Sequence, residues 1–427
     1  MNLPERRNPW LWVPSLYFAE GLPYVVALTV SVIMYKRLGI SNTDIALYTS
    51  LLYLPWVIKP FWAPIVDMVR TKRLWILMLQ LALGVSLAAV AVMIPAPGFF
   101  RATLLLFWLM AFSSATHDIA ADGFYMLALE EHEQAVFVGV RSTFYRIAMV
   151  TGQGLLVIVA GTIEIRSGGN TAFAWSVTFG ILAVMFLLFF AYHRFILPVP
   201  AADVRVQSGG ERSPVAEFFR VFVAFFDRPH IKSILAFLLL YRFAEAQLIK
   251  LVSPFLLDPR VKGGLGLMTS DVGVVYGTVG IIALTLGGLA GGFVIPRRGL
   301  RFWLWPMVII MHLPELAFVY LSRVQPENFV VINAAVAVEQ FGYGFGFTAY
   351  SLYMIMVSGE EHKTAHYAIC TGIMALGMMI PGMFSGALQE WLGYRNFYIW
   401  VMLSTIPGFV VTALISIDRD FGRKSMA

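Results

Sequence analysis

Long runs of apolar residues, separated by short polar segments, extend over the whole sequence. Most runs have about 20 residues or more, which is the length that an α-helix needs to cross the hydrocarbon layer of a membrane. They are not the short alternating segments of a β-barrel. The pattern predicts an all-α integral membrane protein with about twelve transmembrane helices, called spans one to twelve below. These spans are expected at residues 10–34, 44–66, 73–94, 102–129, 135–163, 171–195, 230–257, 271–295, 301–322, 327–357, 364–391 and 395–416.

A long polar segment at residues 198–229 divides the spans into two sets of six. It contains several prolines, a serine and two adjacent glycines, which is typical of a solvated linker. We therefore expect an N-terminal six-helix bundle at 1–197 and a C-terminal six-helix bundle at 230–427.

The two halves also resemble each other in sequence. The segment LEEHEQA at 129–135 has a counterpart, GEEHKTA, at 359–365, and the basic loop at 67–73 has a counterpart at 297–301. Both pairs keep the same offset along the chain. Two parallel six-helix repeats joined by a loop are the layout of a major facilitator transporter.

Composition and charge agree with a membrane protein. Hydrophobic residues make up 59% of the chain and charged residues only 13%, which is more apolar surface than a soluble core could bury. The net charge of +6 comes from Lys and Arg between the spans, so it reflects membrane topology and not nucleic-acid binding. Their distribution predicts that both termini and the linker are cytoplasmic. The single cysteine, Cys370, excludes a disulfide framework.

Span four carries two acids and a histidine. Asp118 and Asp122 are four residues apart and therefore share one helical face, while His117 points about a quarter-turn away. Charges at this depth are costly and normally face a polar cavity or a partner. Glu20 adds a third acid in span one, close to Pro23, where we expect an interruption of the helix.

Basic and polar residues occur in four other spans. Lys59 lies in span two, where its long stem could also reach the interface, and Arg146 lies deeper in span five than Arg141. In span seven, Arg242 and Glu245 could simply neutralise each other. The candidate substrate-binding residues are Lys59, Arg146, Tyr241, Arg242, Glu245, Lys250, Glu339 and Gln340.

The balance of buried acids and cations favours a polar or anionic small molecule as the substrate. A carboxyl group in a cavity of low dielectric constant tends to be neutral, and a nearby cation restores its charge, so acids here permit proton coupling. We assign this role to Asp118, Asp122 and Glu20. The expected partners are the substrate, protons and the lipid bilayer, and we expect a monomer.

Enzymatic and metal-binding functions are less favoured. His117, Asp118 and Asp122 could supply metal ligands, but no second histidine follows at the fourth position and nearby cations would oppose the ion. We expect no metal and no cofactor. The sequence has no convincing P-loop or nucleophile elbow. An intramembrane hydrolase that uses the two aspartates, or a sensor that binds without transport, is the alternative.

The basic loop after span two is the candidate gate. Asp67 precedes Arg70, Lys72 and Arg73, and this loop is one of the repeated features. In major facilitator transporters such a loop holds the cytoplasmic ends of neighbouring helices together. The alternative is an interfacial anchor.

Six segments resemble the AmpG family of muropeptide permeases, which belongs to the major facilitator superfamily, and more distantly the acetyl-coenzyme A transporters. Residues 18–23 resemble its F-x-x-G-L-P, residues 59–67 its K-x-x-W-x-P-x-x-D, and residues 114–122 its S-x-Q-D-I-x-x-D. Tyr145 and Arg146 match its Y-R, residues 339–346 resemble its E-N-x-x-x-G, and residues 366–386 resemble its Q-Y-A-to-G stretch in span eleven. The resemblance implies a permease in the bacterial inner membrane that imports anhydro-muropeptides using the proton gradient.

Two positions depart from that family. His117 stands where the family usually has Gln, and Gln340 stands where it usually has Asn. These two changes bear on the identity of the substrate. A siderophore or a coenzyme A thioester, which are also anionic, is therefore the alternative substrate.

Overall fold

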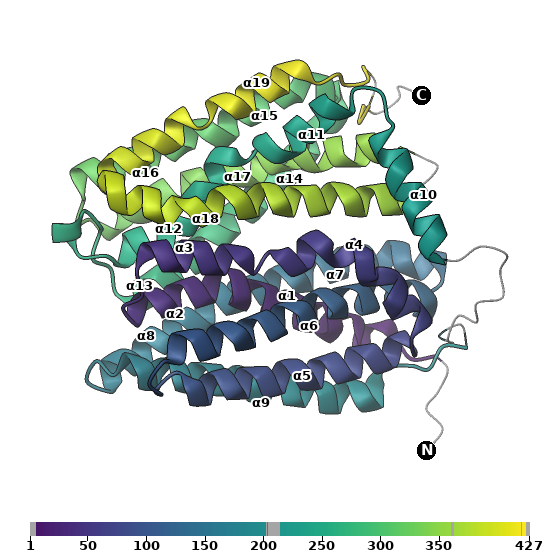
Figure 1. The fold of residues 1–427 in the computed structure, drawn as a ribbon, viewed down its shortest axis with the longest axis horizontal. Helices are drawn as coiled ribbons and strands as arrows, with labels where there is room; N and C mark the ends of the chain where they lie inside the picture. The colour runs from purple at the N-terminus through teal and green to yellow at the C-terminus, as the bar shows by residue number, and fades with distance from the viewer. Residues whose placement is uncertain (1–5, 202, 204–213, 360–362, 420, 424–427) are drawn as a thin grey trace. The chain divides into compact units, whose positions relative to one another are not determined.

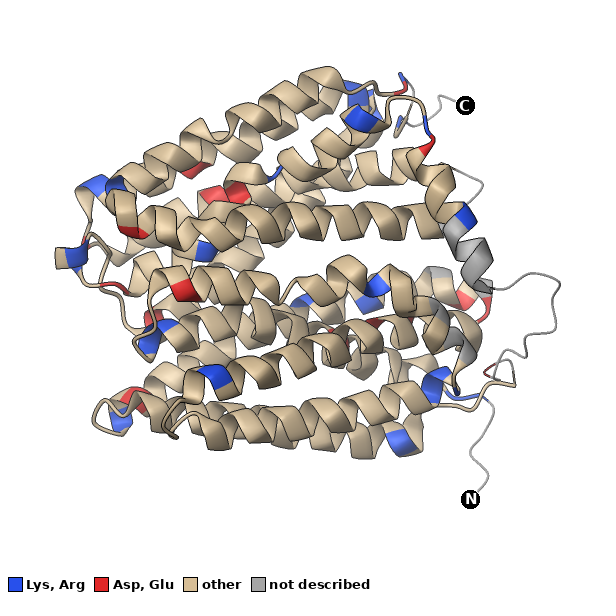
Figure 2. Ribbon diagram, in the orientation of Figure 1, with Lys and Arg blue, Asp and Glu red and all other residues tan. Residues whose placement is uncertain are grey.

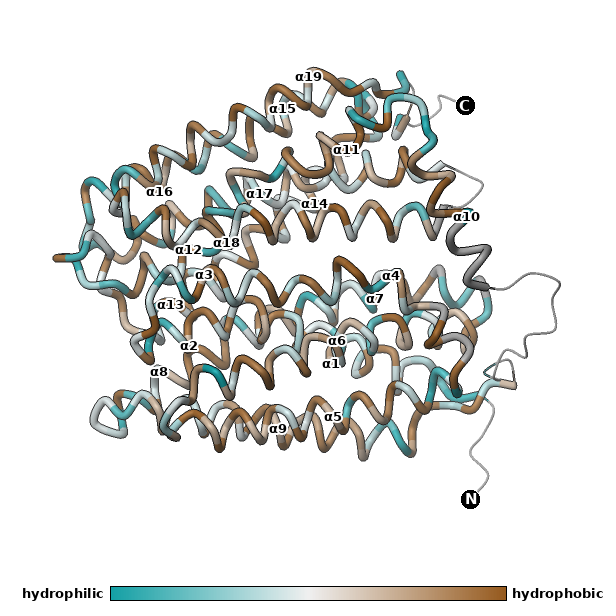
Figure 3. The backbone as a smooth tube through the Cα atoms, viewed as in Figure 1, coloured by the Kyte–Doolittle hydropathy of each residue, from teal (hydrophilic) through white to brown (hydrophobic). Residues whose placement is uncertain are grey.

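The computed structural model describes the chain except residues 1–5, 202, 204–213, 360–362, 420 and 424–427. Every regular element of the described residues is a helix, which confirms the all-α prediction (Figure 1). Figure 3 shows why: apolar residues follow the helices over most of their length, and hydrophilic residues gather at helix ends and in the connections.

The helices of the N-terminal half correspond to the first six predicted spans. Span one begins with a short 3₁₀ turn, η1 (Pro9–Leu11). It then runs without a break through α1 (Val13–Val25), the π turn η2 (Val26–Val30) and α2 (Ser31–Arg37). The others are α3 (Asn42–Leu51) with α4 (Leu54–Met68), α5 (Lys72–Met93), α6 (Phe99–Ala128), α7 (Glu131–Val150) with η3 (Thr151–Leu155) and α8 (Leu156–Arg166), and α9 (Thr171–Ile196).

The C-terminal half begins with α10 (Pro214–Phe226), which was not expected as a helix because it lies in the polar linker. The spans that follow are α11 (Ile231–Leu240) with α12 (Phe243–Leu257), α13 (Thr269–Val272) with η5 (Gly273–Gly280) and α14 (Ile281–Arg298), α15 (Leu300–His312) with η6 (Leu313–Glu315) and α16 (Leu316–Val324), α17 (Phe329–Ser358), α18 (Lys363–Leu403) and α19 (Ile406–Leu414), with the 3₁₀ turn η4 (Arg260–Lys262) between α12 and α13. A kink at Gly393, where φ is 71°, separates spans eleven and twelve within α18.

Span two is divided between α3 and α4, just before Pro55. Span seven is divided at Tyr241 and Arg242, where the sequence has no obvious signal. The expected interruption at Pro23 is different in kind: the helix continues past the proline into a π-helical turn at η2. A π turn widens a helix locally without ending it, so the span stays continuous.

Packing groups the helices into two compact units. One contains residues 1–38 and 58–215, and the other contains residues 39–57 and 216–427. Within the second unit α3 packs along α18, where the Thr43 hydroxyl donates to Glu390 at 2.6 Å and the Asn42 amide donates to Gln389 at 2.6 Å. The division into halves at 1–197 and 230–427 stays a prediction.

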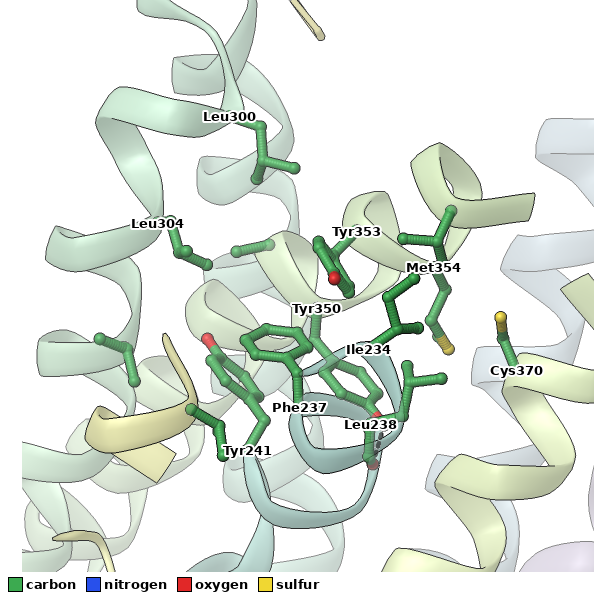
Figure 4. Packing of buried hydrophobic residues seen from close by; sticks show 14 of the residues in the cluster. Ile234, Phe237, Leu238, Tyr241, Leu300, Leu304, Tyr350, Tyr353, Met354 and Cys370 are labelled. Carbon is green, nitrogen blue, oxygen red and sulfur yellow. Dashed lines mark hydrogen bonds between the residues drawn. The ribbon is translucent and has the colours of Figure 1, made fainter. Parts of the chain in front are cut away.

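Aromatic side chains fill the core of the second unit around α11. The ring of Phe237 lies 4.5 Å from that of Tyr353, and Tyr241 stacks on Tyr350 at 5.2 Å (Figure 4). The Tyr350 hydroxyl donates to the carbonyl of Leu238 at 2.6 Å, so its polar group is satisfied inside the core. This cluster anchors the end of α11 directly before the interruption in span seven.

Candidate functional site

Charged residues lie mainly at helix ends, and a smaller number lie inside the helices (Figure 2). In the first unit the internal charges centre on Asp118 of α6. Lys59 of α4 forms an ion pair with the Asp118 carboxylate. Glu20 of α1 is buried and interacts electrostatically with Asp118. The structure therefore brings together three of the predicted site residues from three different helices.

Asp122, one turn further along α6, has a different set of partners. Its Oδ1 accepts hydrogen bonds from the Tyr17 hydroxyl at 3.1 Å and from the Arg141 guanidinium at 2.6 Å. The guanidinium also lies over the rings of Tyr17 and Tyr125, at 4.5 and 5.1 Å from their centroids. Cation–π contacts of this kind fix the direction of an arginine as well as stabilising it.

The partner of Asp122 is therefore Arg141, whereas the sequence favoured Arg146 as the deeper of the two. Arg146 lies further along α7 and is half-buried. Helical phase explains the difference, because residues five apart on a helix point in different directions. A role of Arg146 in substrate binding stays a prediction.

His117 is buried in a chain of polar contacts. Its Nε2 lies 3.1 Å from the amide nitrogen of Gln80, and the Gln80 carbonyl oxygen lies 2.9 Å from Nδ1 of His193. His193 Nε2 in turn contacts the Ser15 hydroxyl at 2.9 Å. Since an amide nitrogen only donates, His117 Nε2 must accept and its proton must lie on Nδ1. The chain links α6, α5, α9 and α1.

In the second unit Arg242 and Glu245 form a two-point ion pair. The guanidinium Nε lies 3.0 Å from one carboxylate oxygen and an Nη lies 2.8 Å from the other. Arg242 also donates to the Tyr343 hydroxyl at 2.7 Å and lies over the ring of Phe347. The two residues thus neutralise each other, as the sequence allowed, and the pair remains fixed at the start of α12.

Lys250 of α12 differs from the other internal cations. Its side chain is buried, its ammonium donates to the Thr49 hydroxyl at 3.0 Å, and it lies 5.3 Å from the ring centroid of Tyr53. Within the described part of the chain, no carboxylate forms an ion pair with it. A buried ammonium that contacts a hydroxyl and a ring, with no carboxylate partner among the described residues, is suited to an anionic ligand.

The remaining substrate-binding candidates lie deep in the second unit. Glu339 and Gln340 of α17 are buried, and the Gln340 amide donates to the Glu339 carboxylate at 2.9 Å. Tyr241 is also buried, but its hydroxyl donates to the carbonyl of Gly346 at 3.1 Å and its ring packs in the aromatic core. Its surroundings are those of a packing residue.

The predicted gate is described only in part, because the side chain of Asp67 lies outside the described residues. Arg70 is exposed and has a φ of 70°. The backbone N–H groups of Lys72 and Arg73 donate to the Asp203 carboxylate at 2.7 and 3.0 Å. An acid at a helix N-terminus satisfies N–H groups that have no partner within the helix.

Arg73 also ties α5 to the end of α9. Its guanidinium donates to the carbonyl of Arg194 at 2.5 Å and to that of Leu197 at 3.4 Å. The start of α5 is thus held by carbonyl groups and by Asp203, which the sequence did not single out. The second copy of the repeated motif, at 359–365, includes residues 360–362, which are outside the described residues.

Several residues that contact the predicted ones were not in the sequence prediction, namely Tyr17, Thr49, Gln80, Arg141 and His193. For Arg141 a signal existed, since it is a charge in an apolar span. For Gln80 and His193 no signal existed, because their partners come from other helices.

Comparisons with known proteins agree with this architecture. The sequence model of the Major Facilitator Superfamily matches residues 15–369. The chain is 24% identical over 413 residues to the putative transporter AmpG 4 of Rickettsia conorii, which covers 93% of this chain and 94% of that protein. It is 25% identical over 415 residues to the anhydromuropeptide permease of Escherichia coli K12, covering 96% of this chain and 80% of that protein.

Solved structures show the same fold at low sequence identity. A bacterial homolog of the human lysosomal transporter Spinster superposes with a TM-score of 0.70 at 16% identity, over 96% of this chain and 97% of the other. A D-xylose-proton symporter superposes with a TM-score of 0.69 at 12% identity, over 97% and 98%.

The resemblance to the AmpG permeases is thereby confirmed, and so is the fold. The family match and the relatives named above point to a multi-pass membrane transporter of a small molecule rather than an enzyme. The family model matches residues 15–369, which is most of the chain. This range includes the internal charges of both units described above. The chain belongs to the Major Facilitator Superfamily.

Proposed function

We propose that this transporter is proton-coupled, lies in the bacterial inner membrane with both termini cytoplasmic, and imports anhydro-muropeptides by alternating access. The observation that carries the coupling is the carboxyl pair of Glu20 and Asp118 beside Lys59. The substrate class rests on the buried cation Lys250 and on the relatives named above.

Two carboxylates that are close together repel each other, so a proton on one of them stabilises the pair. Lys59 compensates the charge of Asp118, whereas no cation forms an ion pair with Glu20 among the described residues, so we assign the proton to Glu20 in this arrangement. When the proton leaves, two adjacent carboxylates share a single ammonium, and their repulsion favours another arrangement of the three helices. Proton occupancy thereby changes the relative stability of the transport states.

Lys250 supports an anionic cargo. A buried ammonium without a carboxylate partner is destabilising in the empty protein, and a carboxylate from the substrate would offset that cost. Muropeptides carry carboxylates together with many hydroxyl and amide groups. The fixed pair Arg242 and Glu245 offers both charges to such a molecule.

Uptake into proteoliposomes tests the proposal. Labelled anhydro-muropeptide is supplied with and without an imposed pH gradient, alongside a siderophore and a coenzyme A thioester. We expect accumulation of the muropeptide that needs the gradient. Accumulation of only one of the other two anions would replace the substrate, accumulation of the muropeptide without a gradient would remove the coupling, and binding without uptake would indicate a sensor.

A further inference from the structure

The second unit contains a buried histidine–carboxyl pair that the proposed function does not use. Nδ1 of His312 lies 2.8 Å from Oε1 of Glu315, and both side chains are 1% exposed. The other ring nitrogen, Nε2, lies 3.2 Å from the backbone carbonyl of Tyr241. Glu315 Oε2 has no hydrogen-bond partner in the described part of the chain.

The contacts of His312 determine how many protons the pair holds. A carbonyl oxygen only accepts, so Nε2 must carry a proton. The contact between Nδ1 and Oε1 also needs a proton, on the nitrogen or on the oxygen, because two lone pairs would otherwise face each other at 2.8 Å. His312 and Glu315 therefore share one proton between Nδ1 and Oε1, and the pair has no net charge.

His312 and Glu315 lie where helices are interrupted. His312 is the last residue of α15, and Glu315 closes η6, the 3₁₀ turn that contains Pro314. The carbonyl that His312 contacts belongs to Tyr241, at the interruption between α11 and α12. That interruption leaves the carbonyl available to a side chain, and His312 thus joins the break in span nine to the break in span seven.

A third helix covers this junction closely. A Cβ atom added to Gly408 of α19 would lie 3.1 Å from the Tyr241 oxygen and 3.3 Å from His312 Nε2. The ring of Phe409 packs at an angle of 62° against the imidazole. There is no room for another ligand at Nε2, so the contact with Tyr241 is replaced only if the helices move.

Two other carboxylates face the pair. Glu245 of α12 interacts electrostatically with both His312 and Glu315, and it is itself paired with Arg242. Glu339 of α17 faces Glu315. Loss of the shared proton would therefore add a negative charge beside two existing acids, of which one has a cationic partner.

We propose that His312 and Glu315 form a second proton-binding site, in the C-terminal half, whose occupancy controls the junction between spans seven and nine. When the proton dissociates to water, Nδ1 and Oε1 no longer share a hydrogen bond, and His312 loses the partner that orients it toward the Tyr241 carbonyl. The two helix interruptions can then separate. The site itself stands on its own geometry, and only its coupling to transport rests on the proposed function.

Infrared difference spectroscopy of the purified full-length protein, titrated with pH and without substrate, tests the site. We expect a band pair from one imidazole and one carboxyl group that titrate together. The pair should be lost in Glu315→Gln and kept in Glu164→Gln, a matched variant of another buried glutamate, which is paired with Arg37 in the first unit. A spectrum of Glu315→Gln identical to that of the unmodified protein would overturn the proposal.

A second variant covers the case in which Glu315→Gln does not fold. His312→Gln keeps an N–H donor toward the Tyr241 carbonyl and removes the titrating ring, so the same bands should vanish; if they persist, the proposal fails. For transport, we expect Glu315→Gln to reduce gradient-driven accumulation at least tenfold, while exchange of substrate across the membrane continues. If the unmodified protein takes up no muropeptide but the bands are present, the proposed function fails and the proton site remains.

Discussion

Lys59 of α4 and Asp118 of α6 form an ion pair inside the first unit. Their side chains are 26% and 21% exposed, so the pair is partly accessible to solvent and not sealed in the core. An ion pair of this kind can open without the full cost of a buried charge. Because Glu20 is a second buried acid that interacts with Asp118, opening of the ion pair can be coupled to the arrival or departure of a proton.

Replacing Asp118 tests that coupling. Asp118→Asn removes the charge and leaves Lys59 without its anion, so we expect gradient-driven accumulation to fall by at least tenfold. Exchange of substrate across the membrane, which needs no net proton movement, should continue. Asp122→Asn should also lower accumulation, since it removes the acid that Arg141 and Tyr17 contact. Normal accumulation in both variants would remove these acids from the mechanism.

The partner of Asp122 can be tested separately. Arg141→Gln removes the cation at 2.6 Å from the Asp122 carboxylate, and we expect a larger loss of uptake than for Tyr17→Phe, which removes one hydrogen bond worth about 1 kcal/mol. Arg166→Gln, at the exposed end of α8, is the control. Initial uptake rates compare the three variants. Equal rates for Arg141→Gln and the control would show that the contact has no role in transport.

Lys250 gives opposite predictions for stability and for binding. Lys250→Met replaces a buried ammonium that has no carboxylate partner among the described residues, so the empty protein should melt at a higher temperature. The same change removes the proposed anion contact, so the apparent KM for muropeptide should rise by roughly tenfold, equivalent to about 1.4 kcal/mol. Thermal unfolding in detergent and uptake at several substrate concentrations measure the two effects. A lower melting temperature with an unchanged KM would contradict this role.

The close packing of α14 and α17 predicts a stability effect with an internal control. A Cβ atom at Gly287 would collide with the backbone carbonyl of Phe341 and lie 3.0 Å from the Phe345 nitrogen. We expect Gly287→Ala to lower the free energy of unfolding by about 1–3 kcal/mol, as overpacking does. Gly292→Ala on the same helix, where an added Cβ meets nothing within 4 Å, should have no such effect. Equal melting temperatures for the two variants would show that α14 shifts to accommodate the methyl group.

The polar chain around His117 predicts a structural role for Gln80. Gln80→Leu removes the polar partner of His117 Nε2 and that of His193 Nδ1, and each unsatisfied buried group costs about 1–3 kcal/mol. His117→Gln should be milder, because an amide can still accept from Gln80. Thermal unfolding compares the two. If His117→Gln abolishes transport in a stable protein, the histidine has a role beyond packing.

The fold could be predicted from the sequence because its signal is local. Each apolar run is long enough to show itself as a span, and the observed helices follow the predicted ones, for example Thr171–Ile196 against 171–195. The interruption at Tyr241 and Arg242 was not predictable in this way, since neither residue breaks a helix by itself. The aromatic packing of α11 and the ion pair of Arg242 with Glu245 stabilise the break.

The acids of the candidate site were also visible in the sequence, because a charge is conspicuous in an apolar helix. Asp118, Asp122 and Glu20 were found this way, and so was Lys59. The partner of each one was not, as Arg141 shows: it pairs with Asp122 although Arg146 lies deeper in the same span.

The sequence by itself thus determined the fold class, the spans and the internal charges, since hydrophobic length and charge are properties of single segments. Only the tertiary structure decided which charges meet. The contacts of Lys59 with Asp118, of Lys250 with Thr49 and of His312 with Tyr241 each join different helices. Such pairings depend on helix rotation and on where each helix is interrupted, which are set by packing between segments far apart in the chain.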